Sequence, residues 1–271
     1  MRRLKHLPGL ALAALLATAT AQPPPADAPP SKVLRYAFRS AETGFDPVAL
    51  SDIYSRAVTG HIFEALYGYD PLARPARIVP LVAAALPETS ADFRTFTVRL
   101  RPGIFFADDP AFGGKPREVV AQDFVYSFKR FADPALNSPN WVSLEEAGLL
   151  GLAALRQQAI KGKTPFPYDR EVEGLRALDR YTLQFKTGEP RPRLVEMMLA
   201  GNDLRGALAR EVVEAYAGKV AEHPVGTGPF RLASWRRSSK IVLERRPATA
   251  SASTRPSRPP TMPRARRSWP G

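Results

Sequence analysis

Short runs in which apolar and polar residues alternate recur along the chain and predict β-strands. The clearest run is residues 94–101 (RTFTVRLR), where Phe96, Val98 and Leu100 alternate with polar side chains. Such a strand buries one face and leaves the other in water. Further strands are predicted for the apolar run at residues 32–39, for two stretches within residues 175–186, and for a hairpin made by residues 223–235 and 240–245.

Apolar residues at helical spacing predict helices. One helix follows Ser51 or Asp52, either of which suits the N-cap position, and we expect Gly68 to end it. His61 lies within this helix and is expected to be a partly buried structural residue. Two more helices are predicted, at residues 123–131 and 208–216.

These elements do not follow the regular strand–helix alternation of a doubly wound nucleotide fold. The stretch between residues 132 and 174 predicts mostly loops. A mixed α/β or α+β architecture follows.

The first 31 residues are expected to lie outside the fold. A cationic head (RRLK), an apolar stretch and the cleavage pattern Ala19-Thr20-Ala21 make residues 1–21 a predicted signal peptide. The apolar stretch is too short to span a membrane. Residues 22–31 predict a proline-rich linker. The chain contains no cysteine, so it lacks the attachment point of a lipoprotein, and we expect a free periplasmic protein held together by its core.

The formal net charge of +13 raises the question of a nucleic-acid partner. Part of this excess lies in residues 1–21 and in the arginine-rich residues 248–271. Between them, basic and acidic residues are interleaved, and no basic helix carries stacking aromatic residues. We therefore expect no nucleic-acid partner.

No pattern of catalytic residues stands out. There is no G-x-S-x-G or H-E-x-x-H motif and no cysteine nucleophile, and His223 precedes a proline in a turn. Asp108 and Asp109 lack calcium-loop spacing and are expected to stabilise a turn. The sequence thus predicts no catalytic residue, no metal site and no cofactor, and it favours a binding protein over an enzyme.

Several segments, in order, resemble the family 5 bacterial extracellular solute-binding proteins, which include the oligopeptide- and dipeptide-binding components of ABC importers. No single motif decides the resemblance, but their order does, and they cover about residues 32–247. The segments are FDP at 45–47, IFEALY at 62–67, VPLVA at 79–83, FTVRLRPGIFF at 96–106, VAQDFVYSFKR at 120–130, ALDRYTL at 177–183, PVGTGPF at 224–230 and IVLER at 241–245.

The resemblance implies a periplasmic binding protein-like fold of class II, in which two lobes close on a solute. It assigns residues 32–69 and 172–247 to an incomplete first lobe and residues 70–171 to a domain inserted in it, and it leaves the second lobe missing. The solute is implied to be a peptide or a similar small molecule, and the protein, acting as a monomer, is implied to deliver it to a membrane permease.

Residues 248–271 are basic and contain no acidic residue, and we expect them to be a disordered tail. The family instead continues at this point with an N-P-x-Y segment. We interpret this tail as the product of a frameshift or sequence error near codon 246. A natural disordered basic tail is the alternative. If the 271 residues are the true product, we expect the chain to bind peptides weakly or not at all. The alternatives are that the chain is a non-functional truncated product or that its basic tail binds anionic polymers.

The resemblance also implies candidate ligand-binding residues. By ungapped comparison, Ser51, Asp52 and Ile53 match the first-lobe segment that pairs with the peptide backbone in oligopeptide binders. Ser51 and Asp52 could instead only cap the helix, and both roles can coexist. Trp141 falls in a loop where the family often places an aromatic residue near the cleft, although a core role is the alternative. The sequence does not identify the solute.

Overall fold

The computed structural model describes residues 32–201 and 203–246. The predicted signal peptide, linker and basic tail lie outside these residues. Among these residues, 32–37 belong to one unit and residues from 38 onward to another. The strand predicted at residues 32–39 is wrong, because this segment contains no strand and Val33 and Leu34 are exposed. Its apolar residues have the composition of a strand, but none of the described strands pairs with its backbone.

The main sheet is antiparallel and has the strand order β3-β4-β6-β5. The register of β4 against β6 places Phe96 opposite Phe185 and Val98 opposite Leu183, and all four side chains are buried. The alternation predicted for this part of the chain is therefore confirmed. The strands are β3 (Glu88–Thr89), β4 (Thr95–Arg99), β5 (Leu175–Ala177) and β6 (Thr182–Lys186).

The sheet crosses the predicted boundary between residues 171 and 172, because β4 comes from one side of it and β5 and β6 from the other. A division of the chain into a lobe and an inserted domain stays a prediction.

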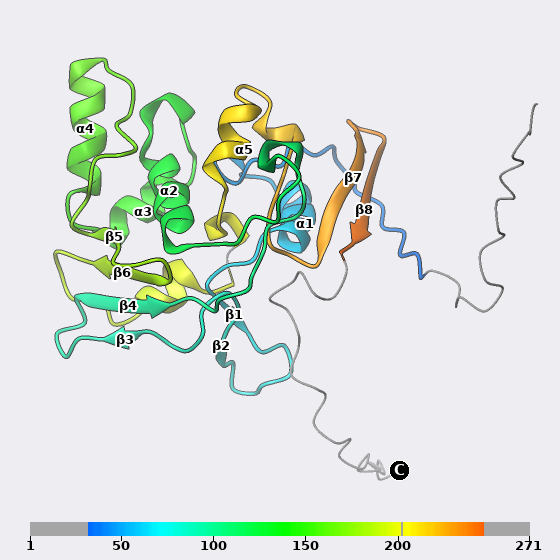
Figure 1. The fold of residues 1–271 in the computed structure, drawn as a ribbon. Helices are drawn as coiled ribbons and strands as arrows, with labels where there is room; N and C mark the ends of the chain where they lie inside the picture. The colour runs from blue at the N-terminus through cyan, green and yellow to red at the C-terminus, as the bar shows by residue number, and fades with distance from the viewer. Residues whose placement is uncertain (1–31, 202, 247–271) are drawn as a thin grey trace, which may run out of the picture. The chain divides into compact units, whose positions relative to one another are not determined.

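Helices cover one side of this sheet (Figure 1). The ring of Phe128 on α2 packs edge-on against Phe185 of β6, with centroids 5.3 Å apart. Two helices, α3 and α4, were not predicted. The N-cap of α4 is Gly151, which has no side chain to signal a start, and the N-cap of α3 is Asn140, whose side chain does not bond to the helix end. These elements are α2 (Ala121–Ala132), α3 (Trp141–Ala147) and α4 (Leu152–Gly162).

A second, smaller core lies between α1 and the β7–β8 hairpin. Phe45 is fully buried there, and its ring centroid lies 4.8 Å from that of Trp235. The predicted hairpin and the helix within residues 208–216 are confirmed. The elements are α1 (Ile53–Ile62), α5 (Arg210–Ala215), β7 (Phe230–Arg236) and β8 (Lys240–Arg245).

Helix α1 ends at Ile62, six residues before Gly68. The apolar run that follows is extended, and the carbonyl oxygen of Leu66 accepts hydrogen bonds from the amides of Leu81 (3.0 Å) and Ala83 (3.1 Å). Gly68 lies within β1 (Tyr67–Tyr69), which pairs with β2 (Ile78–Pro80).

The PVGTGPF motif packs its glycines against the end of α1. A Cβ at Gly226 would lie 2.2 Å from the carbonyl oxygen of Ile62, and one at Gly228 would lie 2.5 Å from that of His61. Only glycine allows this close approach of two backbones. The guanidinium of Arg246 fastens the same turn by donating hydrogen bonds to the carbonyl oxygens of both glycines and of Phe105 and Phe106.

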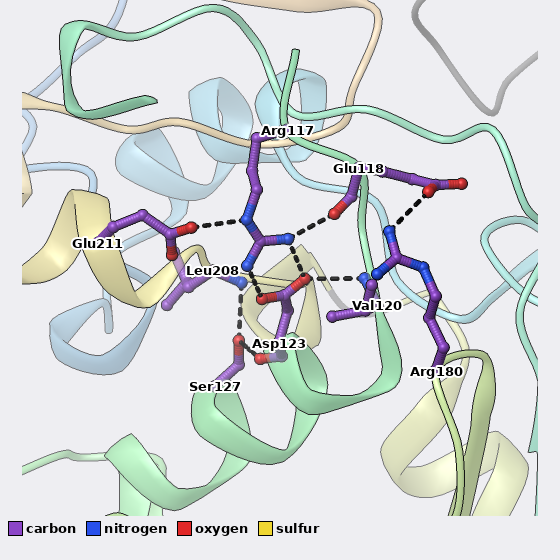
Figure 2. Close-up of polar contacts among 8 residues, drawn as sticks. All are labelled: Arg117, Glu118, Val120, Asp123, Ser127, Arg180, Leu208 and Glu211. Atoms are coloured by element: carbon purple, nitrogen blue, oxygen red, sulfur yellow. Dashed lines mark hydrogen bonds and ion pairs between the residues drawn. The ribbon is translucent and has the colours of Figure 1, made fainter. Parts of the chain in front are cut away.

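A polar network joins α2, α5 and the loop before α2 (Figure 2). Arg117 forms a bidentate ion pair with Asp123, at 2.7 and 3.1 Å, and its Nε donates to Glu211 at 2.6 Å. Burial opposes the charge of Arg117, but these two carboxylates outweigh it and raise the pKa of the guanidinium. The hydroxyl of Ser127 accepts a hydrogen bond from the amide of Leu208 (2.7 Å), which fixes the chain entering α5.

Candidate functional site

The loop that leads into α1 is anchored by Asp46. Its carboxylate accepts two hydrogen bonds from the Arg130 guanidinium of α2, at 2.8 and 2.9 Å, and one from the amide of Val48 at 3.3 Å. Both side chains of the ion pair are buried. Such a bidentate pair fixes direction as well as distance, so the loop leaves the core at a defined place.

Asp52 is the N-cap of α1. One carboxylate oxygen accepts a hydrogen bond from the amide of Ser55 (2.7 Å), and the other accepts one from the hydroxyl of Thr43 (2.6 Å). Partial burial disfavours the charged form, but these hydrogen bonds outweigh it and hold the pKa of Asp52 below its ordinary value of 3.8. The capping role considered for Asp52 is therefore confirmed, and both of its oxygens are engaged within the protein.

Ser51 and Ile53 flank Asp52 and face solvent. Ser51 is exposed, and the side chain of Ile53 is 75 % exposed although it is large and apolar. Both residues line an open depression of about 440 Å³, together with Arg56 and Ala57 of the first turns of α1. Ile53 is the first residue of α1, and an exposed isoleucine held at the start of a helix offers apolar surface to a ligand at little further cost in conformational entropy.

The same loop is bonded to the segment that begins α3. The side-chain amide of Asn140 donates a hydrogen bond of 2.7 Å to the carbonyl oxygen of Leu50, and the hydroxyl of Ser138 donates one of 2.6 Å to that of Val48. Sequence reasoning missed Ser138 and Asn140. The only signal for them was the turn-forming composition of the NSPNW segment.

The structure thus brings the two predicted site segments together, but it places Trp141 in the core. Trp141 is the first residue of α3 rather than part of a loop, and it is only 7 % exposed. The guanidinium carbon of Arg156 lies 5.0 Å from its ring centroid. Whether Trp141 contributes to ligand binding stays a prediction.

The remaining candidates are separate from this loop. His61 is exposed rather than partly buried, and its ring packs edge-on against that of Phe230. His223 stacks on Tyr216 with centroids 3.8 Å apart, and Asp109 bonds to the amide of Ala111, as expected of a turn residue. Within the described residues, no group of three or more metal-ligating side chains comes together.

The loop is held in place by α2 through Asp46 and by the start of α3 through Leu50. It can present both polar and apolar surface to an extended ligand. The sequence model of the bacterial extracellular solute-binding proteins, family 5 middle region, matches residues 77–249, well over half of the chain. The chain belongs to this family of solute-binding proteins.

Among relatives, this family 5 chain is 28 % identical over 204 residues to the periplasmic oligopeptide-binding protein OppA of Salmonella typhimurium. That match covers 74 % of this chain and 34 % of OppA. A dipeptide-binding protein of Escherichia coli is 27 % identical over 247 residues, with 86 % of this chain and 39 % of the relative covered. The chain therefore spans a little more than a third of the length of these relatives.

Solved structures give the same picture. Haemophilus influenzae OppA, in complex with the peptide RPPGFSPFR, is 26 % identical and superposes with a TM-score of 0.62, over 76 % of this chain and 36 % of that one. The mixed α/β architecture is thus part of the periplasmic binding protein fold of OppA-type proteins. In the described part of the chain, no helix has the length and apolar character needed to cross a membrane.

Proposed function

We propose that this chain supplies one face of the binding site for a peptide, or a similar small solute, that an ABC importer takes up. The observation that carries the proposal is the loop at residues 51–53, which faces solvent and is bonded at Leu50 to the start of α3. The resemblance to oligopeptide binders of family 5 implies that the matching segment of those proteins pairs with the peptide backbone. Binding of this kind uses strand addition, which recognises backbone groups and tolerates many side chains.

The proposal assigns separate roles to Ser51 and Asp52, which precede α1, and to Ile53, its first residue. Ser51 and Ile53 face the ligand, whereas Asp52 keeps the loop in shape because both of its oxygens are engaged by Thr43 and Ser55. The role is binding and delivery rather than catalysis, with a membrane permease as the partner and the periplasm as the location.

Affinity for peptides is expected to be low for this chain alone. A site normally buries most of its ligand, and the described residues present a single open depression at the loop. A ligand held on one face gains fewer contacts for the same loss of translational and rotational freedom.

Trialanine is a suitable probe, titrated into the 271-residue chain and followed by NMR shifts, which detect weak binding. We expect saturable binding that Ile53→Asp weakens about tenfold or more, the equivalent of about 1.4 kcal/mol. Ile160→Asp is the matched control, because Ile160 is also an exposed isoleucine but lies on α4. Equal effects of the two substitutions, or no binding by the unchanged chain, would contradict the proposal.

A further inference from the structure

A second cavity lies between α3 and the π-helical turn at Val195–Leu199. Its volume is about 360 Å³, which suits a small ligand. The walls are mainly apolar and include Ala147, Met197 and Met198, although Met197 is 71 % exposed. Unbranched methionine side chains adapt to irregular ligand shapes.

The charged groups on the cavity wall are mostly positive. Arg191 and Arg193 line it, and Glu146 is the one acidic residue among its lining residues. The turn that carries the methionines closes with a hydrogen bond of 2.8 Å from the amide of Ala200 to the carbonyl oxygen of Val195. Such π-helical turns are frequent at functional sites.

A third arginine lies behind the cavity wall. Arg205 is 3 % exposed, and its Nη2 donates a hydrogen bond of 2.9 Å to the hydroxyl of Ser143, which lines the cavity. Its Nε and Nη1 have no hydrogen-bond partner, and no carboxylate pairs with it among the side chains that the structure describes. Burial lowers the pKa of Arg205 to about 10, so the guanidinium is still charged at neutral pH.

The ring of Phe131 offsets part of this burial, with its centroid 4.2 Å from the guanidinium carbon of Arg205. A cation–π contact does not satisfy the two remaining N–H groups. A buried charge without a counter-ion is costly, and an anion brought close to it recovers part of that cost. The hydroxyl of Ser143 accepts a hydrogen bond from Arg205 and donates its own proton to the carbonyl oxygen of Asn140 at 3.0 Å. It can link an anion in the cavity to Arg205 by turning that proton from Asn140 to the anion.

We propose that the cavity between α3 and the π-helical turn binds a small apolar carboxylate, whose charge is stabilised by Arg205 through Ser143 and whose apolar part lies on Met197 and Met198. This inference deepens the proposed function, on which it rests in part, since the carboxylate could be the C-terminus of a bound peptide. It could equally be that of a free carboxylic acid. The chemistry recognised is the same in both cases.

The test uses the 271-residue chain labelled with ¹³C at the methionine methyl groups. The chain has four methionines, so the signals of Met197 and Met198 can be followed while Met1 and Met262 serve as internal references. Hexanoate is the probe, and hexanamide is the uncharged control of the same shape. We expect a saturable shift of the Met197 and Met198 signals with hexanoate and none with hexanamide at the same concentrations.

Two substitutions test the role of the buried charge. Arg205→Met keeps an unbranched side chain and removes the charge, and we expect it to weaken hexanoate binding about tenfold or more. Ser143→Ala changes an exposed side chain that carries little risk to folding, and the same direction is expected. Arg176→Met on β5 is the control, because Arg176 is an exposed arginine outside the cavity.

Equal shifts with hexanoate and hexanamide would overturn the inference. So would an Arg205→Met variant that folds, judged by its circular dichroism, and binds hexanoate as tightly as the unchanged chain. If that variant does not fold, undiminished binding by Ser143→Ala overturns it instead.

The source of the carboxylate is decided by competition. Trialanine that displaces hexanoate, where trialanine amide does not, identifies a peptide C-terminus. Hexanoate binding that depends on Arg205 but is unaffected by trialanine identifies a free carboxylic acid. The proposed function fails on a different measurement, namely if the NMR titration detects no trialanine binding that depends on Ile53.

Discussion

The side-chain amide of Asn140 donates a hydrogen bond of 2.7 Å to the carbonyl oxygen of Leu50, across 90 residues of sequence. This contact, with that from Ser138 to Val48, holds the loop at residues 51–53 against the start of α3. The shape of the proposed solute-binding face therefore depends on residues that are not themselves proposed to touch the solute.

Asn140→Ala should loosen this face. Loss of one partly buried hydrogen bond is expected to lower the free energy of unfolding by about 0.5–1.5 kcal/mol, and trialanine binding should weaken as well. Chemical denaturation and the NMR titration measure the two effects. Gln157→Ala, which removes an exposed amide on α4, should change neither. Unchanged peptide binding in Asn140→Ala would show that the contact is irrelevant to the site.

The buried pair of Asp46 and Arg130 should be among the most sensitive positions of the chain. Asp46→Ala leaves a buried guanidinium without its carboxylate, so the free energy of unfolding should fall by about 3–5 kcal/mol. Arg176→Met breaks the exposed pair with Glu171 and should cost less than about 1 kcal/mol. Urea denaturation of the two variants compares them directly, and similar losses would refute the role given to the buried pair.

The cap on α1 should depend on pH. Because the pKa of Asp52 is lowered in the folded chain, its carboxylate contributes stability above about pH 3.8 and loses it as the pH falls through the folded-state value. At neutral pH, Asp52→Ala should lower the free energy of unfolding by about 0.5–2 kcal/mol.

Thermal unfolding between pH 7 and pH 3 should show this penalty shrinking on acidification. Ser51→Ala is the neighbouring control, for which no such pH dependence is expected. A penalty from Asp52→Ala that stays constant down to pH 3 would mean that ionised Asp52 does not stabilise the cap.

Two glycines should respond in opposite directions to the same substitution. Gly226→Ala would place a Cβ 2.2 Å from the backbone oxygen of Ile62, so we expect strong destabilisation or failure to fold. Gly60 lies in α1, where an added Cβ would have no atom within 4 Å, and Gly60→Ala should stabilise the chain by up to about 1 kcal/mol. Thermal unfolding checks both, and a Gly226→Ala variant as stable as the unchanged chain would contradict the close packing of the two backbones.

Strong local patterns were enough to predict β4, α2 and the β7–β8 hairpin, because their periodicity matches the face that each element buries. The end of α1 was misplaced, since Ala65 and Leu66 continue the helical spacing of apolar residues although residues 63–66 are buried outside the helix. Periodicity does not separate the two cases for short runs. The bond between Asn140 and Leu50 depends on tertiary structure, and no local signal in the sequence specifies it.

The candidate site shows the same limits. Asp52 was predicted as a possible cap because an aspartate before a helical pattern is a local signal. The burial of Arg205 was not predicted, because an arginine in a polar segment is typical of a solvated surface. Only the packed structure shows that it is buried.

Amide hydrogen exchange of the 271-residue chain, with and without trialanine, tests the solute-binding face most directly. Binding at this face predicts slower exchange in the presence of the peptide at residues 50–56 and 140–147, and also at residues 190–198 if the peptide C-terminus occupies the cavity beside α3, with the rest of the described chain unchanged. Slowing confined to other segments, such as the β7–β8 hairpin, or no slowing at a peptide concentration that saturates the NMR shifts, would contradict it.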